Sequence, residues 1–516
     1  MKIFKILCLI FNILLLPMPV LAQSDGPGIF DKMKLSVESS TIVSSGDYAP
    51  LWLSSNKYGL SSVEPSSNYE RVSLMRGTEN DSLKSWRWGY GLDLAVCFNS
   101  TSNFVVQQAY VDLVYKKLKL TAGAKEQPID LRNNQLTSGG LGIGINARPI
   151  PQLRLESDYF SVPGTNHWWK MKFRGSYGMT TDGSWQKDFH ADSSRYTNNV
   201  LYHEKALYWK FGREEKFPLT FEIGLQMATM FGGTSYNVSG RGHHGLNNIK
   251  HENGFSAFWD AFVAGGNDVT DGVDRNTAGN HLGSYNMALS YVFPEWKARA
   301  YFERYFEDQS MLTLQYGIYD HLLGLEVELP KNPFVNSFVL EHISTKDQSG
   351  AVYHDKTASM PDKMNGRDNY YYHLLYTGWQ HWGMALGHPL ITSPIYNENN
   401  VINFRNNRIM AWHFGLSGQP TDEFAYRVLL TFTENWGTYI TPFDDVLKQN
   451  SYLFEVFYHL KRFIGWSATF SLGYDVVVAK EATDSFTEED YLGGLAYLKT
   501  CYGADAYSNE ELIAML

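Results

Sequence analysis

The stretch WRWGYGLDLAVCF, residues 86–98, indicates the fold class of this chain. Every even position in it carries an apolar side chain, whereas the odd positions carry arginine, glycine, aspartate, alanine and cysteine. An alternation with period two is typical of a β-strand that has one apolar and one polar face. The run is also long enough to cross a bilayer as a tilted strand. It therefore predicts a strand with lipid on one face and water on the other.

The same alternation recurs along nearly the whole chain. It is clear in 153–159, 169–179, 221–227, 285–293 and 466–474. We therefore predict an all-β fold, a transmembrane antiparallel β-barrel of about 18 strands in the outer membrane, with lipid outside and a polar lumen. The predicted strands lie near residues 69–79, 85–98, 103–116, 117–126, 153–160, 167–179, 201–211, 219–230, 282–293, 296–307, 323–330, 335–345, 370–387, 408–417, 423–435, 451–460, 465–476 and 492–502.

Composition agrees with a membrane barrel. Aromatic residues make up 15% of the chain although its mean hydropathy is only −0.30. That is more aromatic surface than a soluble core of this polarity needs, and membrane barrels gather such residues in two interfacial girdles.

The first 22 residues predict export. Lys2 and Lys5 precede an apolar stretch over 6–16, and Val20-Leu21-Ala22 fits a signal-peptidase site. Cleavage there removes two lysines and changes the formal net charge from −10 to −12. This acidity argues against nucleic acid as a partner. The expected location is the cell outer membrane, and the expected partners include outer-membrane lipid and the barrel insertion machinery.

The predicted organisation has four parts. Residues 1–22 are the cleaved signal peptide, 23–68 an N-terminal periplasmic or plug segment, 69–502 the transmembrane barrel, and 503–516 a tail. The tail reads as a short acidic helix, whereas outer-membrane barrels usually end on a strand with an aromatic residue.

Turn lengths predict the orientation, because such barrels have short periplasmic turns and long extracellular loops. The tight connection at Pro294-Glu295 is expected on the periplasmic side, and the stretch 232–281 on the outside, with a short amphipathic helix near 255–262. Segment 370–387 fits this orientation only if the chain reverses near Gly378.

The motifs that would indicate catalysis are missing from the sequence. There is no Walker loop, HExxH motif or GxSxG elbow, and the glycine-rich run 139–144 lacks a βαβ context and alternates as a strand does. We therefore expect no enzyme activity, no cofactor and no metal site. His243 and His244 lie in a polar loop, where solvation is a simpler role than metal binding.

Aromatic and polar side chains on the loops are candidates for binding a sugar polymer. The longest loop carries Tyr236, His243, His244 and Trp259. Aromatic faces stack on the apolar side of sugar rings, and polar groups bind the hydroxyls. The predicted lumen face around Trp168 is a second candidate surface.

Particular segments show a family resemblance. Asn146-Ala147-Arg148-Pro149-Ile150-Pro151 resembles a signature of the Wzi family of capsule assembly proteins. Further segments resemble Bacteroides-type members of that family, namely PLWLSSNKYG at 50–59, Asn406-Asn407-Arg408 with His413, and Asn435-Trp436-Gly437-Thr438-Tyr439. The resemblance covers roughly residues 34 to 480. The positions that carry it include Asn146, Arg148, Pro149, Pro151, Asn407, Arg408, His413 and Trp436.

The resemblance implies an eighteen-stranded outer-membrane barrel that acts as a surface lectin for capsular polysaccharide. We therefore hypothesise a non-enzymatic barrel that binds surface polysaccharide and assists capsule assembly or attachment. Two alternatives stay open: a general diffusion porin, and an outer-membrane enzyme that modifies lipid or glycan.

Overall fold

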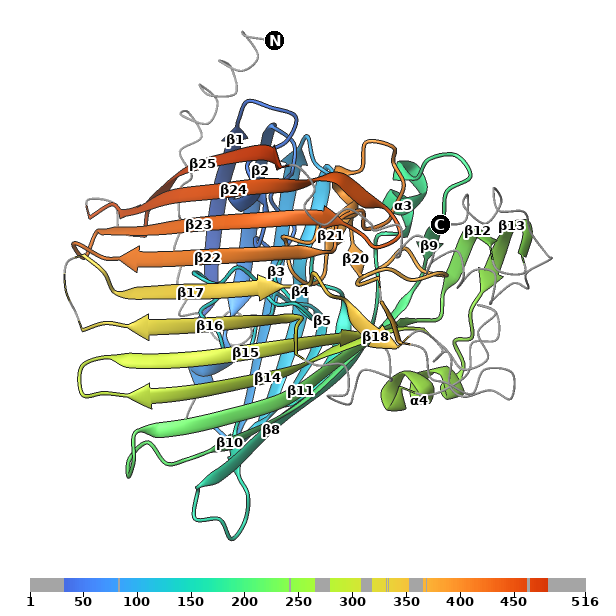
Figure 1. The fold of residues 1–516 in the computed structure, drawn as a ribbon. Helices are drawn as coiled ribbons and strands as arrows, with labels where there is room; N and C mark the ends of the chain where they lie inside the picture. Colours follow the sequence, from blue (N-terminus) through green and yellow to red (C-terminus); the bar gives the residue numbers. More distant parts are fainter. Residues whose placement is uncertain are drawn as a thin grey trace.

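One antiparallel sheet dominates the computed structural model, which describes residues 32–81, 84–240, 243–264, 279–307, 318–330, 332, 334–351, 365–367, 369–461 and 465–480. The sheet contains eighteen strands (Figure 1). Both β6 and β7 pair with β8, so they lie end to end and the wall has seventeen positions. The strands are β1 (Lys34–Val43), β2 (Ser66–Arg76), β3 (Trp86–Phe98), β4 (Phe104–Tyr115), β5 (Leu118–Ala124), β6 (Gln152–Ser157), β7 (Phe160–Ser161), β8 (Trp169–Met179), β10 (Leu201–Phe211), β11 (Leu219–Phe231), β14 (Asn280–Val292), β15 (Lys297–Glu307), β16 (His321–Glu328), β17 (Ser337–Ser344), β22 (Ile409–Gly418), β23 (Phe424–Gly437), β24 (Pro442–His459) and β25 (Ser467–Lys480).

The predicted two-faced strands are confirmed. In β3, Leu92 and Phe98 are exposed, whereas Asp93 and Cys97 are buried. Cys97 is a free thiol on the inner face. Exposed apolar side chains continue around the wall on other strands, at Val111, Leu120, Leu155, Leu207, Phe221, Leu289, Leu325, Leu340, Phe454 and Phe470. An apolar outer belt around a polar interior defines a transmembrane β-barrel.

The wall begins earlier than residue 69. The alternating residues of β1 pair with β2 along its full length, from Lys34 opposite Met75 to Val43 opposite Ser66. This placement corrects the predicted start of the barrel, because ten residues assigned to the N-terminal segment form a wall strand.

Segment 370–387 is not a wall strand, which corrects another prediction. The strands β17 and β22 pair directly, with Glu341 opposite His413. The described chain between them turns inward, and within 370–387 the strands are only the two-residue β20 (Gln380–His381) and β21 (Met384–Ala385). No reversal near Gly378 is then needed to keep the wall antiparallel.

The two ends of the barrel differ. Short turns connect the strands at one end, whereas the other end carries long connections with α3 (Gly183–Phe189), α4 (Phe255–Val263) and a small sheet (Figure 1). The small sheet has the order β13-β12-β9. We call these ends the turn end and the loop end. The remaining short elements are η1 (Thr78–Asp81), α2 (Leu51–Ser54), β9 (Tyr196–Asn198), β12 (Thr234–Gly240), β13 (His243–Lys250), β18 (Ser349–Ala351), β19 (Asn365–Arg367) and η5 (Pro394–Tyr396).

The helix predicted near 255–262 is confirmed as α4. Within the described ranges, no helix has the length and apolar character needed to cross a membrane. Both β1 and β25 run from the turn end to the loop end, so antiparallel closure requires one further strand between them. The predicted strand 492–502, the signal peptide and the tail 503–516 lie outside the described residues.

The two faces of β14 offer a test of the membrane assignment. Leu289 is exposed on the outer face, whereas its neighbour Ser290 is buried and accepts a hydrogen bond from Arg299 Nε at 3.2 Å. Leu289→Asp would place a charge in lipid at a cost of about 1–2 kcal/mol, less than that of a cation at the bilayer centre. We expect less heat-modifiable barrel in the membrane fraction. Ser290→Asp would face Arg299 and should insert normally; equal losses would contradict the assignment.

Candidate functional site

Three connections from the loop end fold into the barrel and fill its lumen. They are residues 44–65, 125–151 and 369–408, and together we call them the plug. Their apolar side chains form one buried cluster with the inner wall, including Trp52, Leu136, Leu141, Trp379 and Tyr371 with Tyr301, Val339 and Ile343 of the wall. The interior of this barrel is therefore packed in the manner of a protein core.

The first plug segment is fixed to strands at the far end of the sequence. Trp52 Nε1 donates to Thr431 Oγ1 of β23 at 3.0 Å, and the amide of Leu51 donates to the carboxylate of Asp475 in β25 at 2.9 Å. His413 completes this contact, since its Nδ1 lies 2.8 Å from the same Thr431 hydroxyl and its ring 5.3 Å from that of Trp52. The family-motif residue His413 thus fixes the plug to the wall.

Glu303 of β15 holds the second plug segment. Its buried carboxylate pairs with Arg132 at 2.5 Å and accepts the amides of Leu141 and Gly142 at 2.9 and 3.0 Å. The run 139–144 was expected to alternate as a strand does. It is instead an irregular segment, and its amides at Leu141 and Gly142 face this carboxylate. A charge buried this way is stable only when its partners stay in place.

A second wall glutamate acts in the same way. Glu341 of β17 accepts hydrogen bonds from the Thr137 hydroxyl at 2.6 Å, the Ser138 amide at 2.7 Å and the Tyr301 hydroxyl at 2.5 Å. The two glutamates therefore hold one plug segment from two different wall strands.

The third plug segment packs on the second. Trp379 Nε1 donates to the carbonyl of Gly142 at 2.9 Å, and the Tyr371 hydroxyl donates to the carbonyl of Leu141. Tyr370 reaches outward, and its hydroxyl donates to Asp320 near the start of β16 at 2.8 Å. The described plug segments thus form one hydrogen-bonded unit.

Two of the family-like motifs meet inside the plug. The amide of Asn56 donates to Asn146 Oδ1 at 3.1 Å, and Arg148 Nε donates to the carbonyl of Gly59 at 3.3 Å. Gly59 has φ +63°, and a Cβ there would lie 2.7 Å from the amide of Arg148. The motifs at 50–59 and 146–151 therefore fix the packing of one plug segment on another.

The Arg148 guanidinium is buried and lies 4.5 Å from the ring centroid of Trp382. Burial lowers its pKa to about 10. Pro149 lines a cavity beside the plug, and the carbonyl of Pro151 accepts the amide of Met179 at 3.2 Å. These motif residues connect the plug to the wall strand β8.

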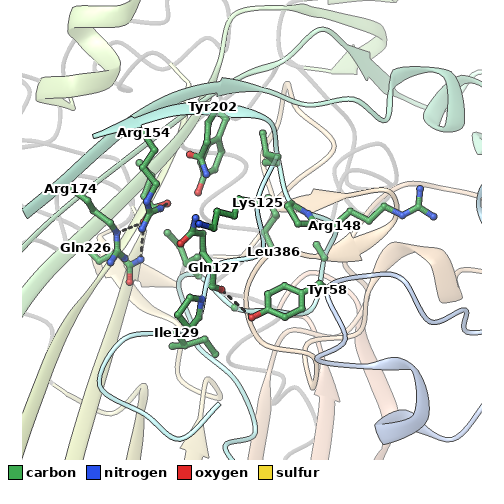
Figure 2. A pocket seen from close by; sticks show the side chains of 18 of the residues that line it. Tyr58, Lys125, Gln127, Ile129, Arg148, Arg154, Arg174, Tyr202, Gln226 and Leu386 are labelled. Atoms are coloured by element: carbon green, nitrogen blue, oxygen red, sulfur yellow. Dashed lines mark hydrogen bonds and ion pairs between the residues drawn. The ribbon is translucent and has the colours of Figure 1, made fainter. Parts of the chain in front are cut away.

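A small cavity of about 80 Å³ separates the plug from β6, β8, β10 and β11. Figure 2 shows Arg154, Arg174 and Gln226 on its wall side, and Arg148 extending away from it. The wall arginines are neutralised, because Glu204 lies 3.2 Å from Arg154 and 2.5 Å from Arg174. The cavity is far smaller than the 300–1,000 Å³, roughly, of a typical ligand pocket.

One carboxylate links the plug to these wall cations. Asp130 of the plug pairs with Lys172 at 2.5 Å and also with Arg174. Burial opposes its ionisation, yet the two cations lower its pKa well below the usual value. The charges around the cavity therefore hold the plug against the wall.

The other family-like motifs meet at the loop end, where β22 begins and β23 ends. The amides of Asn407 and Arg408 donate to the carbonyl of Gly437 at 3.2 and 3.1 Å, and the amide of Trp436 donates back to the carbonyl of Arg408 at 3.0 Å. Asn407 also receives Gln348 Nε2 on its Oδ1 at 2.8 Å. These hydrogen bonds hold residues 406–408 beside residues 435–439, so the side chains of the two motifs lie next to each other.

Their side chains form a cluster of cations and aromatic rings. The Arg408 guanidinium lies 3.7 Å from the ring centroid of Tyr439, and Lys346 Nζ lies 4.5 Å from that of Trp436. The indole N–H of Trp436 is buried and has no hydrogen-bond acceptor among the described residues. We call Lys346, Arg408, Trp436 and Tyr439 the rim cluster.

The predicted loop residues are spread over two places. The ring of Tyr236 in β12 stacks on Tyr196 of β9 at 4.6 Å, whereas Trp259 lies on α4. His243 and His244 begin β13, and their side chains fall outside the described set. The described residues contain no group of three or more His, Cys, Asp or Glu that could hold a metal ion.

Trp168 does not face the lumen, which corrects its predicted position. It lies in the turn before β8, its carbonyl accepts the amide of Gly212 at 2.9 Å, and its ring lies 5.3 Å from that of Phe211. Half of its side chain is exposed. Trp168 therefore belongs to the aromatic surface of the turn end, away from the long loops.

Sequence reasoning did not single out Glu303, Glu341, Lys346 or Tyr439 for these roles. Both glutamates are buried on the inner face of their strands, and nothing in the sequence pattern marks them as plug anchors. Tyr439 was part of a quoted motif, and its pairing with Arg408 required the fold.

The barrel and its filled lumen define a class of protein, a plugged transmembrane β-barrel. Neither the family models nor the curated proteins gave a match. Among solved structures, the chain is similar to Wzi from Escherichia coli, an outer-membrane carbohydrate-binding β-barrel involved in group 1 capsule assembly. That similarity has 12% identity and a TM-score of 0.49, over 86% of this chain and 80% of that one.

Two further solved structures are similar at lower TM-scores. OccK10 (OpdN) of Pseudomonas aeruginosa has 10% identity and a TM-score of 0.38, over 87% of this chain and 92% of that one. An anion-selective porin from Comamonas acidovorans has 9% identity and a TM-score of 0.29, over 78% and 92%. At such identities the likeness concerns the barrel fold, and the function must be argued from this chain's own geometry.

Proposed function

We propose that this protein is a non-conducting outer-membrane barrel that binds surface polysaccharide at its loop end and assists capsule attachment or assembly. The filled lumen is the observation that carries the proposal. A diffusion porin needs a continuous water path, whereas here plug side chains such as Trp52, Leu141 and Trp379 pack against the wall. The loop end is then the surface available to a large ligand.

The rim cluster supplies suitable chemistry at that end. The half-buried ring of Tyr439 offers a face for the apolar side of a sugar, and the buried Arg408 and Trp436 beside it hold the cluster in place. The stacked rings of Tyr236 and Tyr196 form a second aromatic surface on the loops. A repeating polymer engages several such surfaces together, so avidity does not require a deep pocket.

The rim cluster provides the test of polysaccharide binding. Each cation–aromatic or stacking contact contributes about 0.5–2 kcal/mol, so Tyr439→Ala combined with Arg408→Gln should weaken polymer binding about tenfold or more. Binding is measured on a glycan array and by retention of capsule on cells. Trp168→Ala is the matched control, because it removes an exposed ring at the turn end.

Heat modifiability on gels must show that both variants remain folded. Unchanged polymer binding by the folded rim variant would contradict the proposed site. Steady, large conductance of the unaltered protein in planar bilayers would contradict the proposed function and favour the porin.

A further inference from the structure

Helix α4 lies against the outside of the barrel wall, near the loop end. The ring of Phe258 lies 5.1 Å from Tyr177 of β8 and 5.2 Å from Phe231 at the end of β11. The Tyr177 hydroxyl donates to the carbonyl of Phe258 at 2.8 Å. Since Tyr177 has the same parity as the exposed Met179, it belongs to the outer face of its strand. The helix therefore covers outer wall, not lumen.

The wall beneath α4 changes from apolar to polar. On the outer face of β10, Leu207 and Trp209 are exposed, and the next outward positions toward the loop end are Lys205 and His203. Lys205 Nζ donates to the carbonyl of Phe262 on α4, and His203 lies buried 5.7 Å from the Phe262 ring. The helix thus lies where the lipid-facing belt ends.

The helix itself has three distinct faces. Successive residues of a helix are rotated by about 100°, which places Phe258 and Ala261 on the face toward the wall. Phe258 contacts Tyr177, and Ala261 is buried. Ser256 and Asp260 lie on a polar face. The third face carries exposed apolar side chains, with 88% of Phe255 and 57% of Trp259 exposed, followed by Phe262 and Val263.

We propose that this third face of α4 inserts into the outer leaflet and contacts lipid acyl chains at the membrane interface. It continues the apolar belt of the wall at the height where Lys205 marks the belt's end. A short helix with a strongly apolar face and a tryptophan is suited to the headgroup and acyl-chain boundary. Trp259 is then a membrane anchor, and polymer binding belongs to the rim cluster.

A site-specific probe tests the depth of α4. The background carries Cys97→Ser and Cys501→Ser, and a single cysteine at Phe255 or at Ser256 is labelled with an environment-sensitive fluorophore. The full-length protein is placed in lipid nanodiscs that contain a phospholipid with a nitroxide near the top of its acyl chain. The two labels are neighbours in sequence, yet one lies on the apolar face and the other on the polar face.

We expect the Phe255→Cys label to be quenched at least about twofold more strongly than the Ser256→Cys label. Equal quenching of the two labels would overturn the proposal. A label at residue 255 that is shielded from water in the absence of lipid would also overturn the proposal, because the protein itself would then cover this face. Shielding only after addition of polysaccharide would assign the face to the polymer instead.

Discussion

Glu303→Gln is expected to loosen the plug and turn a silent barrel into a conducting one. The substitution leaves Arg132 buried without its charged partner and weakens the bonds to the amides of Leu141 and Gly142. Breaking a buried ion pair from one side costs about 3–5 kcal/mol. In planar bilayers we expect openings that the unaltered protein does not show, and faster proteolysis within 125–151.

A matched control separates loss of the plug from general damage to the wall. Glu222 is also buried, but its partners are Lys210 at 3.6 Å and the Tyr159 hydroxyl at 2.6 Å, neither of which belongs to the plug. Glu222→Gln should therefore leave the barrel silent. A silent Glu303→Gln barrel, or equal currents from both variants, would show that Glu303 does not hold the plug.

Acid is expected to open the plug while the wall stays folded. Burial lowers the pKa of His388 in the plug to about 3 and also lowers the pKa of His381. His388 Nδ1 accepts the amide of Leu390 at 3.3 Å, and His381 Nε2 accepts that of Thr181 at 3.1 Å. A proton on His388 Nδ1 or on His381 Nε2 would point at the backbone N–H group from which that nitrogen accepts. The closed plug therefore favours neutral rings.

The sign of the pH effect follows from these lowered pKa values. When the plug opens, each ring is released into water and titrates near pH 6.5. Above that pH the closed state keeps its full stability. Below it, each histidine lowers the stability of the closed state by about 1.4 kcal/mol per pH unit. For His388 the loss continues down to about pH 3. At pH 4.5 the stability that the closed state loses through His388 reaches about 2.7 kcal/mol. We expect bilayer currents to rise between pH 6 and pH 4.5.

His388→Gln tests this explanation, because the glutamine oxygen can still accept the Leu390 amide but does not titrate. Its current should depend less on pH than that of the unaltered protein. An identical pH response in the variant would exclude His388 as the titrating group. The heat-modifiable band must persist at low pH, since the expected change concerns the plug alone.

The wall of this barrel was largely predictable from the sequence, because each wall strand is in contact with only two environments. Lipid on one side and the polar interior on the other impose a period of two, which β3 shows over its whole length. The boundaries of β10, predicted as 201–211, agree with the structure. Strand β1 was the exception: its residues alternate, but Pro50, Pro65 and the many serines of 23–68 favoured a periplasmic or plug segment for this whole stretch.

The plug could not be predicted in the same way. Its residues meet wall, neighbouring plug segments and small cavities in no regular order, so no period marks which side chains are buried. Segment 370–387 contains as many aromatic residues as a wall strand, yet Tyr371 and Trp379 are fully buried inside. The quoted motifs marked positions such as Asn146 and His413, but only the fold shows that they join plug segments to each other and to the wall.

The contact between the first plug segment and the last described strands has a consequence for assembly. Leu51 and Asp475 are hydrogen-bonded across a sequence separation of 424 residues, and Trp52 and Thr431 across 379. Contacts between such distant positions form late, because the loop they close is entropically costly. Residues 44–65 can make these contacts only once β23 and β25 are in place. Closure of the lumen by this segment is thereby coupled to completion of the wall, because its packing is complete only in a sheet that already contains both strands.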